Sequence, residues 1–268
     1  MFGGIAFGMP SLIESEDLVA DLALCAELGL DFVELNANLP HTQPERLAGT
    51  GLHARLDACG LYLTLHVEEN LGICDFNSRV AAAWLQTVRD DIAFAHALGI
   101  PILNLHLSGG VYFSLPDHKV YLFEKFRDRY LESLRRFRGM CETDVGDSGI
   151  LLCVENCEGF PAFACEGIDL LLESPVFALT WDIGHDHSDR WADRDLLLAR
   201  RDRVHHMHFH DATDRASHQV PGDGVINLED RLAFARAAGC RVVLETKSID
   251  GLRRAVDWVR AWAGRQSR

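Results

Sequence analysis

One pattern recurs along the chain and restricts its fold more than any other feature. A helical stretch is followed by a glycine and then by a short apolar run, as in LCAELGLDFVEL, LDACGLYLTLH, FAHALGIPILNLH and ARAAGCRVVLE. Glycine adopts a left-handed backbone at the end of a helix at little cost, and the runs that follow have the length and composition of strands. The pattern therefore predicts a chain that alternates between helices and the strands of a parallel sheet.

The full chain contains eight such strand–helix units. Strands are expected near residues 3–7, 32–35, 61–66, 101–106, 150–155, 177–182, 204–210 and 241–245. Helices are expected near residues 16–28, 43–59, 78–98, 118–142, 162–173, 193–201, 228–238 and 249–262. We therefore expect the α/β class and one (β/α)8 TIM barrel domain over residues 1–268, since such a barrel typically needs about 250 residues. An open doubly wound sheet is the alternative; the even spread of the strands and the lack of a GxGxxG motif count against it.

Net charge and cysteine usage limit the partners and the compartment. The formal net charge of -14 argues against nucleic acid and against a membrane surface as partners. The eight cysteines form no CxxC pair, which is typical of a reduced, cytoplasmic protein. The N-terminus has no basic signal-peptide region and no apolar run reaches about 18 residues, so no membrane span is expected. A homo-oligomer is left open.

Metal-competent side chains stand at or near the C-terminal ends of six consecutive expected strands. They are His66, His106, Glu155, Asp182, His208 and Glu245. Residues two positions earlier are small or polar, as in Thr64, Asn104 and Thr180. The interleaved residues are large and apolar, and they are Leu61, Leu63, Leu65, Leu103, Leu105, Phe177, Leu179 and Trp181. Because alternate residues of a strand point to opposite faces, we expect the first set to point into the barrel and the second set toward the helices.

Six such residues at one level of a barrel need a special explanation, although a single His or Glu at a strand end is usually a hydrogen-bonded surface residue. Clustered carboxylates repel one another and lose hydration unless a cation lies among them. Three imidazoles and three carboxylates suit Zn²⁺, Mn²⁺, Co²⁺ or Fe²⁺ rather than an all-oxygen Ca²⁺ site. The set exceeds the needs of one four-coordinate ion. We therefore expect a divalent metal as cofactor, as one ion or as two ions bridged by a carboxylate such as Glu155.

The segment HHMHFHDA, residues 205–212, contains four histidines. On a strand, His206, His208 and His210 share one face, which points into the barrel. His205 lies on the opposite, apolar face, where a packing or surface role is expected. His206 lies deeper in the barrel than His208, where a hydrogen-bonded core role is expected. A His-x-His pair can chelate one ion, so the pairs 206/208 and 208/210 both stay open.

Further polar residues lie near the same strand ends. His185 belongs to DIGH, and His218 precedes a Gly-x-Gly turn in HQVPGDG. Glu34 has the level and parity of the site, but it can equally hold the barrel floor through hydrogen bonds. Glu68 and Glu69, in HVEEN, are expected to be exposed loop residues.

Five segments, VEN, WDIGH, HFHDA, PGDG and LETK, have an order and spacing that resemble the xylose isomerase-like barrel superfamily. The resemblance covers nearly the whole chain. That superfamily includes sugar isomerases and epimerases, and the AP endonuclease family 2 group with endonuclease IV. The resemblance implies that its common metal-binding set of Glu, Asp, His and Glu falls on Glu155, Asp182, His208 and Glu245. The family's histidine three positions before an acid, here Asp211, selects His208 within the histidine run.

The two branches of the superfamily imply different roles for the remaining residues. In the epimerase branch, the glutamates matching Glu155 and Glu245 also exchange protons with the substrate, and His185 matches a substrate-contacting histidine. In the nuclease branch, histidines matching His66 and His106 bind a second metal, and His185 matches a third-metal ligand.

An Asp-x-His pair also precedes the Gly-x-Gly turn in the nuclease branch. Here the segment reads ASH, so His218 matches but Ala216 replaces the aspartate. Asp211 or Asp186 is a candidate substitute in that third-metal site, and His210 is a candidate for supporting the ligands or contacting substrate.

Two enzymatic hypotheses follow. The first is a metal-dependent isomerase or epimerase of a small-molecule substrate, a sugar or sugar phosphate, acting through an enediolate with Glu155, Glu245 and His185 as catalytic residues. The second is a di-metal phosphoester hydrolase related to endonuclease IV, acting on a small molecule rather than on DNA. A non-catalytic metal-holding or sugar-binding protein is the third reading.

Overall fold

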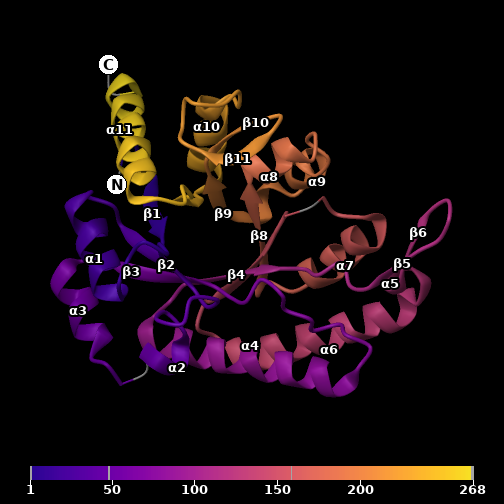
Figure 1. Ribbon diagram of the computed structural model, residues 1–268. Helices are drawn as coiled ribbons and strands as arrows, with labels where there is room; N and C mark the ends of the chain where they lie inside the picture. Colours follow the sequence, from indigo (N-terminus) through magenta and orange to yellow (C-terminus); the bar gives the residue numbers. More distant parts are fainter. Residues whose placement is uncertain (1, 48, 158, 267–268) are drawn as a thin grey trace.

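Eight parallel strands close into a barrel in the computed structural model, which describes residues 2–47, 49–157 and 159–266 (Figure 1). In order around the barrel the strands are β1 (Ala6–Pro10), β12 (Arg241–Leu244), β9 (Val204–Phe209), β8 (Phe177–Asp182), β7 (Leu151–Glu155), β4 (Ile102–His106), β3 (Tyr62–His66) and β2 (Phe32–Asn36). Strand β1 pairs with both β2 and β12, so the two ends of the chain complete the closure. The predicted single-domain TIM barrel is confirmed.

Helices connect the strands and cover the outside of the barrel (Figure 1). They are α1 (Leu18–Glu27), α2 (Pro44–Leu47), α3 (Leu52–Cys59), α4 (Ser78–Leu98), α5 (Leu122–Lys125), α6 (Arg127–Val145), α7 (Ala162–Leu172), α8 (Ile183–Ser188), α9 (Arg194–Ala199), α10 (Leu228–Ala238) and α11 (Ile249–Gln266), with a 3-10 helix at Arg201–Arg203. Gly99 and Gly239, with φ of 65° and 72°, follow α4 and α10 in the left-handed conformation that the repeated pattern predicts. No helix within the described ranges is long and apolar enough to cross a membrane.

Near the N-terminus the boundaries differ from those expected. The first strand begins at Ala6 rather than at residue 3, because Gly3 and Gly4 have φ of 56° and 81° and form a turn between Phe2 and Ile5. The helix expected over residues 43–59 is divided into α2 and α3, and Gly51 between them has φ of 71°. Residue 48, within that expected helix, lies outside the described residues.

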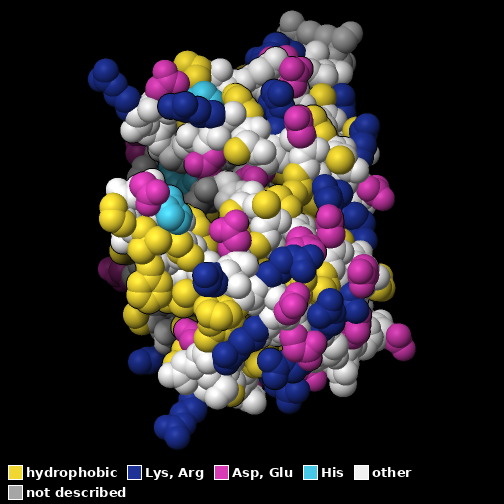
Figure 2. Space-filling view, turned by 90° about the vertical axis from the view of Figure 1, so that its right-hand side faces the viewer, with side chains coloured by type: hydrophobic (Ala, Val, Ile, Leu, Met, Phe, Trp, Pro, Cys, Tyr) yellow, Lys and Arg dark blue, Asp and Glu magenta, His cyan; other side chains and the backbone are white. Residues whose placement is uncertain are grey.

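The helix expected over residues 118–142 is preceded by a hairpin. Strands β5 (Tyr112–Ser114) and β6 (Lys119–Tyr121) pair antiparallel, and helix begins only at Leu122. Tyr112 and Phe113 are exposed, and hydrophobic side chains gather on the face of the molecule to which this hairpin belongs (Figure 2). Helix α8 and a second hairpin, β10 (Asp211–Thr213) with β11 (Ala216–Gln219), were likewise not expected. These additions all follow C-terminal ends of barrel strands, where they surround the mouth.

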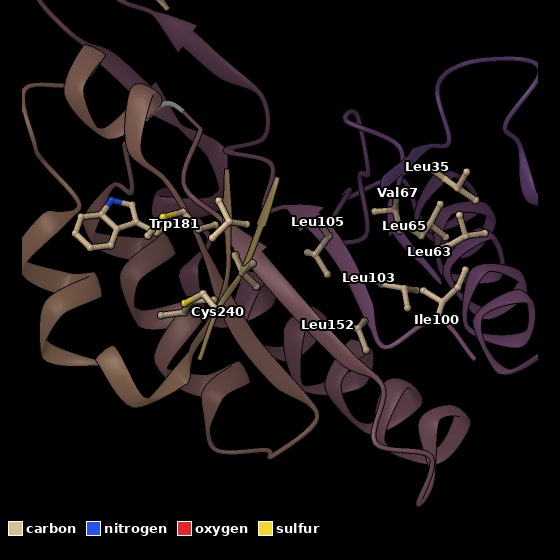
Figure 3. Close-up of a cluster of buried hydrophobic side chains, with 14 of the residues drawn as sticks. Leu35, Leu63, Leu65, Val67, Ile100, Leu103, Leu105, Leu152, Trp181 and Cys240 are labelled. Carbon is tan, nitrogen blue, oxygen red and sulfur yellow. The ribbon is translucent and has the colours of Figure 1, made fainter. Parts of the chain in front are cut away.

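The two faces of the barrel strands carry the two sets of side chains that alternation predicts. All eight apolar residues expected to face the helices are buried, and Figure 3 shows part of this layer, including Leu63, Leu65 and Trp181. Inside the barrel, Ile102, Cys153 and Ala178 form a separate small cluster. No cysteine in the described part of the chain forms a disulfide. The apolar layer fixes the strands, so the residues at their C-terminal ends have defined positions.

Candidate metal centre at the barrel mouth

The six candidate ligands meet at the C-terminal mouth of the barrel. Asp182 lies opposite His208 and His106 opposite Glu155, but Glu155 lies opposite Thr180 rather than Asp182. The strands of a closed barrel are tilted and staggered, so residues at a similar height along the barrel axis are offset in the pairing register. The side chains are long enough to bridge the stagger.

His208 is the centre of the first cluster. Its Nδ1 lies 3.0 Å from Glu155 Oε1, 3.4 Å from Glu245 Oε2 and 3.8 Å from Asp182 Oδ2. These are the four residues that the resemblance selects, and all of them come from separate strand ends. The four side chains converge on one point with three carboxylates around one imidazole nitrogen.

Charge interactions dominate this cluster. Burial alone would raise the pKa of Glu155, but His208, His106 and His66 hold it well below its usual range. Burial would also raise the pKa of Glu245, and His208 with Lys247 lowers it instead. Conversely, burial would lower the pKa of His208, but the surrounding glutamates raise it well above its usual range. The carboxylates of Glu155 and Glu245 are therefore ionised, and a positive charge between them is needed to offset their repulsion.

A divalent cation fits that demand. His208 Nδ1 and Glu245 Oε2 are buried, and neither has a hydrogen-bond partner among the described residues. Glu155, Asp182 and His208 also offer one donor atom each within 4.8 Å of one another. Buried polar atoms without partners are costly unless a ligand satisfies them. The donor set of one imidazole and three carboxylates suits the borderline transition metals expected from the sequence.

Glu34 lies below the cluster and orients it. Its Oε1 lies 2.8 Å from His208 Nε2 and its Oε2 lies 2.7 Å from His206 Nε2, while Thr64 Oγ1 donates a third bond of 2.9 Å. Because a carboxylate can only accept, His208 Nε2 carries a proton, and Nδ1 is the nitrogen that can exchange its proton for a cation at the mouth. Of the two roles open to Glu34, the structure shows the hydrogen-bonding one, and it places His206 in the buried core as expected.

His66 and His106 approach Glu155 from the other side. Their Nε2 atoms lie 3.4 Å and 3.2 Å from Glu155 Oε2, which also accepts a hydrogen bond from Asn104 Nδ2. His66 Nδ1 lies 2.8 Å from the Val67 carbonyl, which can only accept, so Nδ1 carries the proton. The Nε2 lone pair of a neutral His66 therefore faces a carboxylate, an arrangement that a second cation or a proton would relieve. His66, His106 and Glu155 form a second group of three donors.

His210 supports Asp182 and is not placed as a ligand of the first cluster. The backbone N–H of His218 donates to His210 Nδ1 over 3.0 Å, so Nε2 carries the proton and points at Asp182 Oδ1, 3.1 Å away. This approach requires Gly184, because a Cβ there would lie 1.8 Å from His210 Cε1. Asn156 adds a reciprocal pair of hydrogen bonds to the backbone of Asp182. Asp182 is thus fixed from both sides.

His185 and His218 stand on the rim of the mouth. His185 Nε2 lies 3.8 Å from Asp182 Oδ2, and the ring centroids of His185 and His218 are 5.3 Å apart. His218 Nε2 lies 3.6 Å from Glu245 Oε2, and His210, His218 and Glu245 form a further donor group. Burial lowers the pKa of His218 to about 4, so its ring is neutral at physiological pH.

Asp211 and Asp186, the suggested substitutes for the aspartate missing at Ala216, both have hydrogen-bond partners of their own. Both oxygens of Asp211 accept hydrogen bonds from the backbone of the PGDG turn, at Gly222, Gly224 and Ile226. Asp186 Oδ2 accepts from Trp181 Nε1, so it faces away from the cluster. Asp211 thus shapes the turn, and Asp186, a residue of α8, holds that helix against Trp181 of β8.

Three residues of the mouth were missed or misjudged from the sequence. Lys247 Nζ lies 2.7 Å from Glu245 Oε1, and alternation from Glu245 could have identified it. Asn156, the last letter of VEN, could not be assigned without its contact to β8. Glu69 is exposed in a turn, as expected, and it also lines the mouth cavity of about 790 Å³, together with His66, His185 and Lys247.

Known proteins match this architecture over most of the chain. A family model described as the xylose isomerase-like TIM barrel matches residues 22–262. The uncharacterized protein MJ1614 of Methanocaldococcus jannaschii is 24% identical over 205 residues, which are 74% of this chain and 76% of that protein.

Solved structures share the fold at low sequence identity. A D-tagatose 3-epimerase-like protein has a TM-score of 0.76 at 19% identity, covering 98% of each chain. The 3-keto-D-glucoside 4-epimerase YcjR of E. coli has a TM-score of 0.73 at 17% identity, covering 96% of this chain and 99% of that one. The IOLI protein with a bound zinc atom has a TM-score of 0.70 at 15% identity, covering 98% and 96%. These structures share the fold, and the family model, which matches residues 22–262, establishes that the chain belongs to the xylose isomerase-like TIM barrel family.

Proposed function

We propose that the protein is a divalent-metal-dependent isomerase or epimerase of a sugar or sugar phosphate. The observation that carries the proposal is the meeting of Glu155 and Glu245 at His208 Nδ1. These glutamates come from β7 and from the residue after β12, which are separated around the barrel by β8 and β9. Two ionised carboxylates thus reach one point from different walls of the mouth.

The residues that would hold the cation are Glu155, Asp182, His208 and Glu245. A divalent ion bound there, such as Zn²⁺, Mn²⁺, Co²⁺ or Fe²⁺, supplies electrostatic stabilisation of the negative charge that develops on a carbonyl oxygen and its neighbouring hydroxyl. The similarity of the fold to that of the IOLI protein, whose structure contains a bound zinc atom, supports the choice of a transition metal. Glu34, His210 and Asn156 keep the ligands in place from behind.

The two glutamates suit the proton transfers of an epimerase. One carboxylate removes the proton from the carbon next to the carbonyl, which gives an enediolate, and the other returns a proton to the opposite face. Lys247 contacts Glu245, whereas the side chains of His66, His106, His208 and Asn104 contact Glu155, so the two carboxylates have different surroundings. His185 stands on the rim, where it can contact substrate hydroxyl groups. The mouth cavity of about 790 Å³ has room for a small sugar.

The test uses Glu155→Gln and Glu245→Gln in protein loaded with Mn²⁺ or Zn²⁺ and assayed on a panel of ketoses and ketose phosphates. We expect each variant to lower kcat by about 10²- to 10⁴-fold, because each loses a proton-transfer group. Glu142→Gln, on the far surface of α6, is the matched control and should retain activity. Full activity in both Glu155→Gln and Glu245→Gln would show that these glutamates do not transfer the protons.

A second candidate, a di-metal phosphoester hydrolase of small molecules, is favoured by one observation. His66 and His106 both direct Nε2 at Glu155 Oε2 and form a second donor group beside the first. Two ions bridged by Glu155 would suit activation of water for attack on a phosphoester. Two bound ions per chain, together with phosphodiester hydrolysis lost in His66→Ala, would favour this candidate; one ion without hydrolysis would eliminate it.

A further inference from the structure

A second cavity lies outside the barrel, away from the mouth. It has a volume of about 750 Å³ and lies between α4 on one side and α2 with the start of α3 on the other. These elements lie together at the lower left of Figure 1. Helix α4 contributes residues 87, 90, 91, 93, 94, 97 and 98, which form one stripe along the helix. None of its lining residues lines the mouth cavity, so a ligand here would not occupy the proposed active site.

The charged side chains that line this cavity are predominantly acidic. Its described lining includes four carboxylates, Glu45, Glu68, Asp90 and Asp91, and it includes no lysine or arginine. His53 is the one residue of this lining that can carry a positive charge, and it is exposed on α3. A cavity with these walls attracts cations and repels anions.

Asp91 differs from the acids of an ordinary surface cluster because its side chain is buried. Its side chain is 2% exposed, and Oδ2 is buried with no hydrogen-bond partner among the described residues. Burial, followed by Glu68, Asp90 and Glu45, raises the pKa of Asp91 to about 8. A buried carboxyl oxygen left without a partner is costly, and it is retained at a helix position where an alanine or leucine would pack.

The other walls indicate the kind of cation. Leu47, Leu52 and Phe94 are buried residues that line the cavity from α2, α3 and α4. The described donor groups whose atoms lie within 4.8 Å of one another are all at the barrel mouth or beneath it, and Asp91 belongs to none of them. The carboxylates are therefore too widely spaced to surround a bare metal ion, whereas an ammonium group with an apolar body would use both the acids and the apolar walls.

We propose that this cavity is a binding site for a small organic cation, with its ammonium group at Asp91 and its apolar body against Leu47, Leu52 and Phe94. The ammonium group supplies the hydrogen bonds that Asp91 Oδ2 lacks. Its positive charge also offsets the repulsion that Glu45 and Glu68 exert on Asp91 once Asp91 is ionised. The site is separate from the proposed active site and does not depend on the reaction catalysed there.

The first test compares two probes of the same shape by isothermal titration calorimetry at pH 7. Phenethylammonium carries the charge, and 2-phenylethanol is its neutral counterpart. We expect phenethylammonium to bind at least about tenfold more tightly, as a charge-assisted hydrogen bond predicts. Because Asp91 is largely protonated when the cavity is empty, binding should also release protons, seen as a dependence of the heat on the buffer. Equal binding of the two probes, or displacement by equimolar Mg²⁺, would overturn the proposal.

The second test uses variants. Asp91→Asn keeps the shape of the side chain and should abolish both the preference for phenethylammonium and the proton release. Glu45→Gln alters an exposed acid on α2, which leaves folding intact, and it should weaken phenethylammonium binding several-fold. Asp128→Asn, fully exposed on α6, is the matched control and should bind as the unaltered protein does. If Asp91→Asn fails to fold, Glu45→Gln still tests the proposal. An unchanged preference of Glu45→Gln for phenethylammonium over 2-phenylethanol would contradict it.

Discussion

At the scale of single residues, the two nitrogens of His208 have separate tasks. Nε2 is held by Glu34 and Nδ1 faces the three carboxylates of the mouth. Strand alternation was enough to separate His208 from His205, since it depends only on the parity of the positions. It could not choose among His206, His208 and His210, because that choice depends on Glu34, which lies 174 residues away in sequence from His208.

This division of tasks gives the first prediction. Glu34→Gln removes the negative charge below His208 and permits the wrong imidazole tautomer, so we expect metal affinity to fall by about 10- to 100-fold. The measurement is competition with a chromophoric chelator for Zn²⁺. Glu27→Gln, which alters an exposed carboxylate on α1, serves as the control. Equal affinity in Glu34→Gln and the control would show that Glu34 does not position the ligand.

At the scale of elements, the sequence predicted the barrel strands well but not the short elements of the mouth. The strands and long helices carry periodic apolar patterns over many residues. Hairpins β5–β6 and β10–β11 and helix α8 are too short for such a pattern. Their positions depend on tertiary contacts, such as the bonds of Asp211 to the turn that follows β11. The candidate ligands could be predicted because they end regular strands, and alternation from Glu245 also reaches Lys247. Asn156 and the third-site geometry could not be predicted.

Helix α8 depends on the close approach of Gly184 to His210. In Gly184→Ala the added Cβ overlaps the imidazole, and we expect a loss of about 1–3 kcal/mol in the free energy of unfolding together with weaker metal binding. Gly139→Ala is a matched control, since a Cβ there meets nothing within 4 Å in the middle of α6. It should stabilise the protein by up to about 1 kcal/mol. Urea denaturation measures both; a neutral Gly184→Ala would refute the close approach.

The contact between α8 and β8 also predicts a pH dependence. Burial raises the pKa of Asp186 from 3.8 to about 6. The folded state thus binds a proton between these values that the unfolded state has lost, so this contribution to stability is present at low pH and disappears as pH rises through 6.

Asp186→Asn removes that titration. The free energy of unfolding of Asp186→Asn minus that of the unaltered protein should increase by about 2 kcal/mol when the pH is raised from 4.5 to 7.5. The amide loses one hydrogen-bond acceptor toward Trp181 or Asp193, but that cost is the same at both pH values. Asp195→Asn, on exposed α9, should show no such change. If the difference in free energy of unfolding between Asp186→Asn and the unaltered protein were the same at both pH values, Asp186 would not be the titrating group.

At the scale of the whole molecule, closure of the barrel gathers residues that are far apart along the chain. Fold class followed from the repeated pattern, because eight strand–helix units have few ways to bury both faces of a sheet. The pairing partners of the candidate ligands did not follow from the sequence, since the stagger of a closed barrel appears only in the pairing register. The barrel also separates two sites of different character: the acidic cavity beside α4 and the metal-competent mouth.

The central claim is that the mouth uses a divalent cation and its glutamates to exchange a proton next to a carbonyl. The most direct measurement is proton NMR of free and phosphorylated ketoses incubated in D₂O with the metal-loaded protein. We predict deuterium at the carbon next to the carbonyl of a sugar in the panel, with appearance of its epimer or isomer, and loss of both when a chelator is added. Metal-loaded protein that exchanges no sugar in the panel, while hydrolysing a phosphodiester, would contradict the claim.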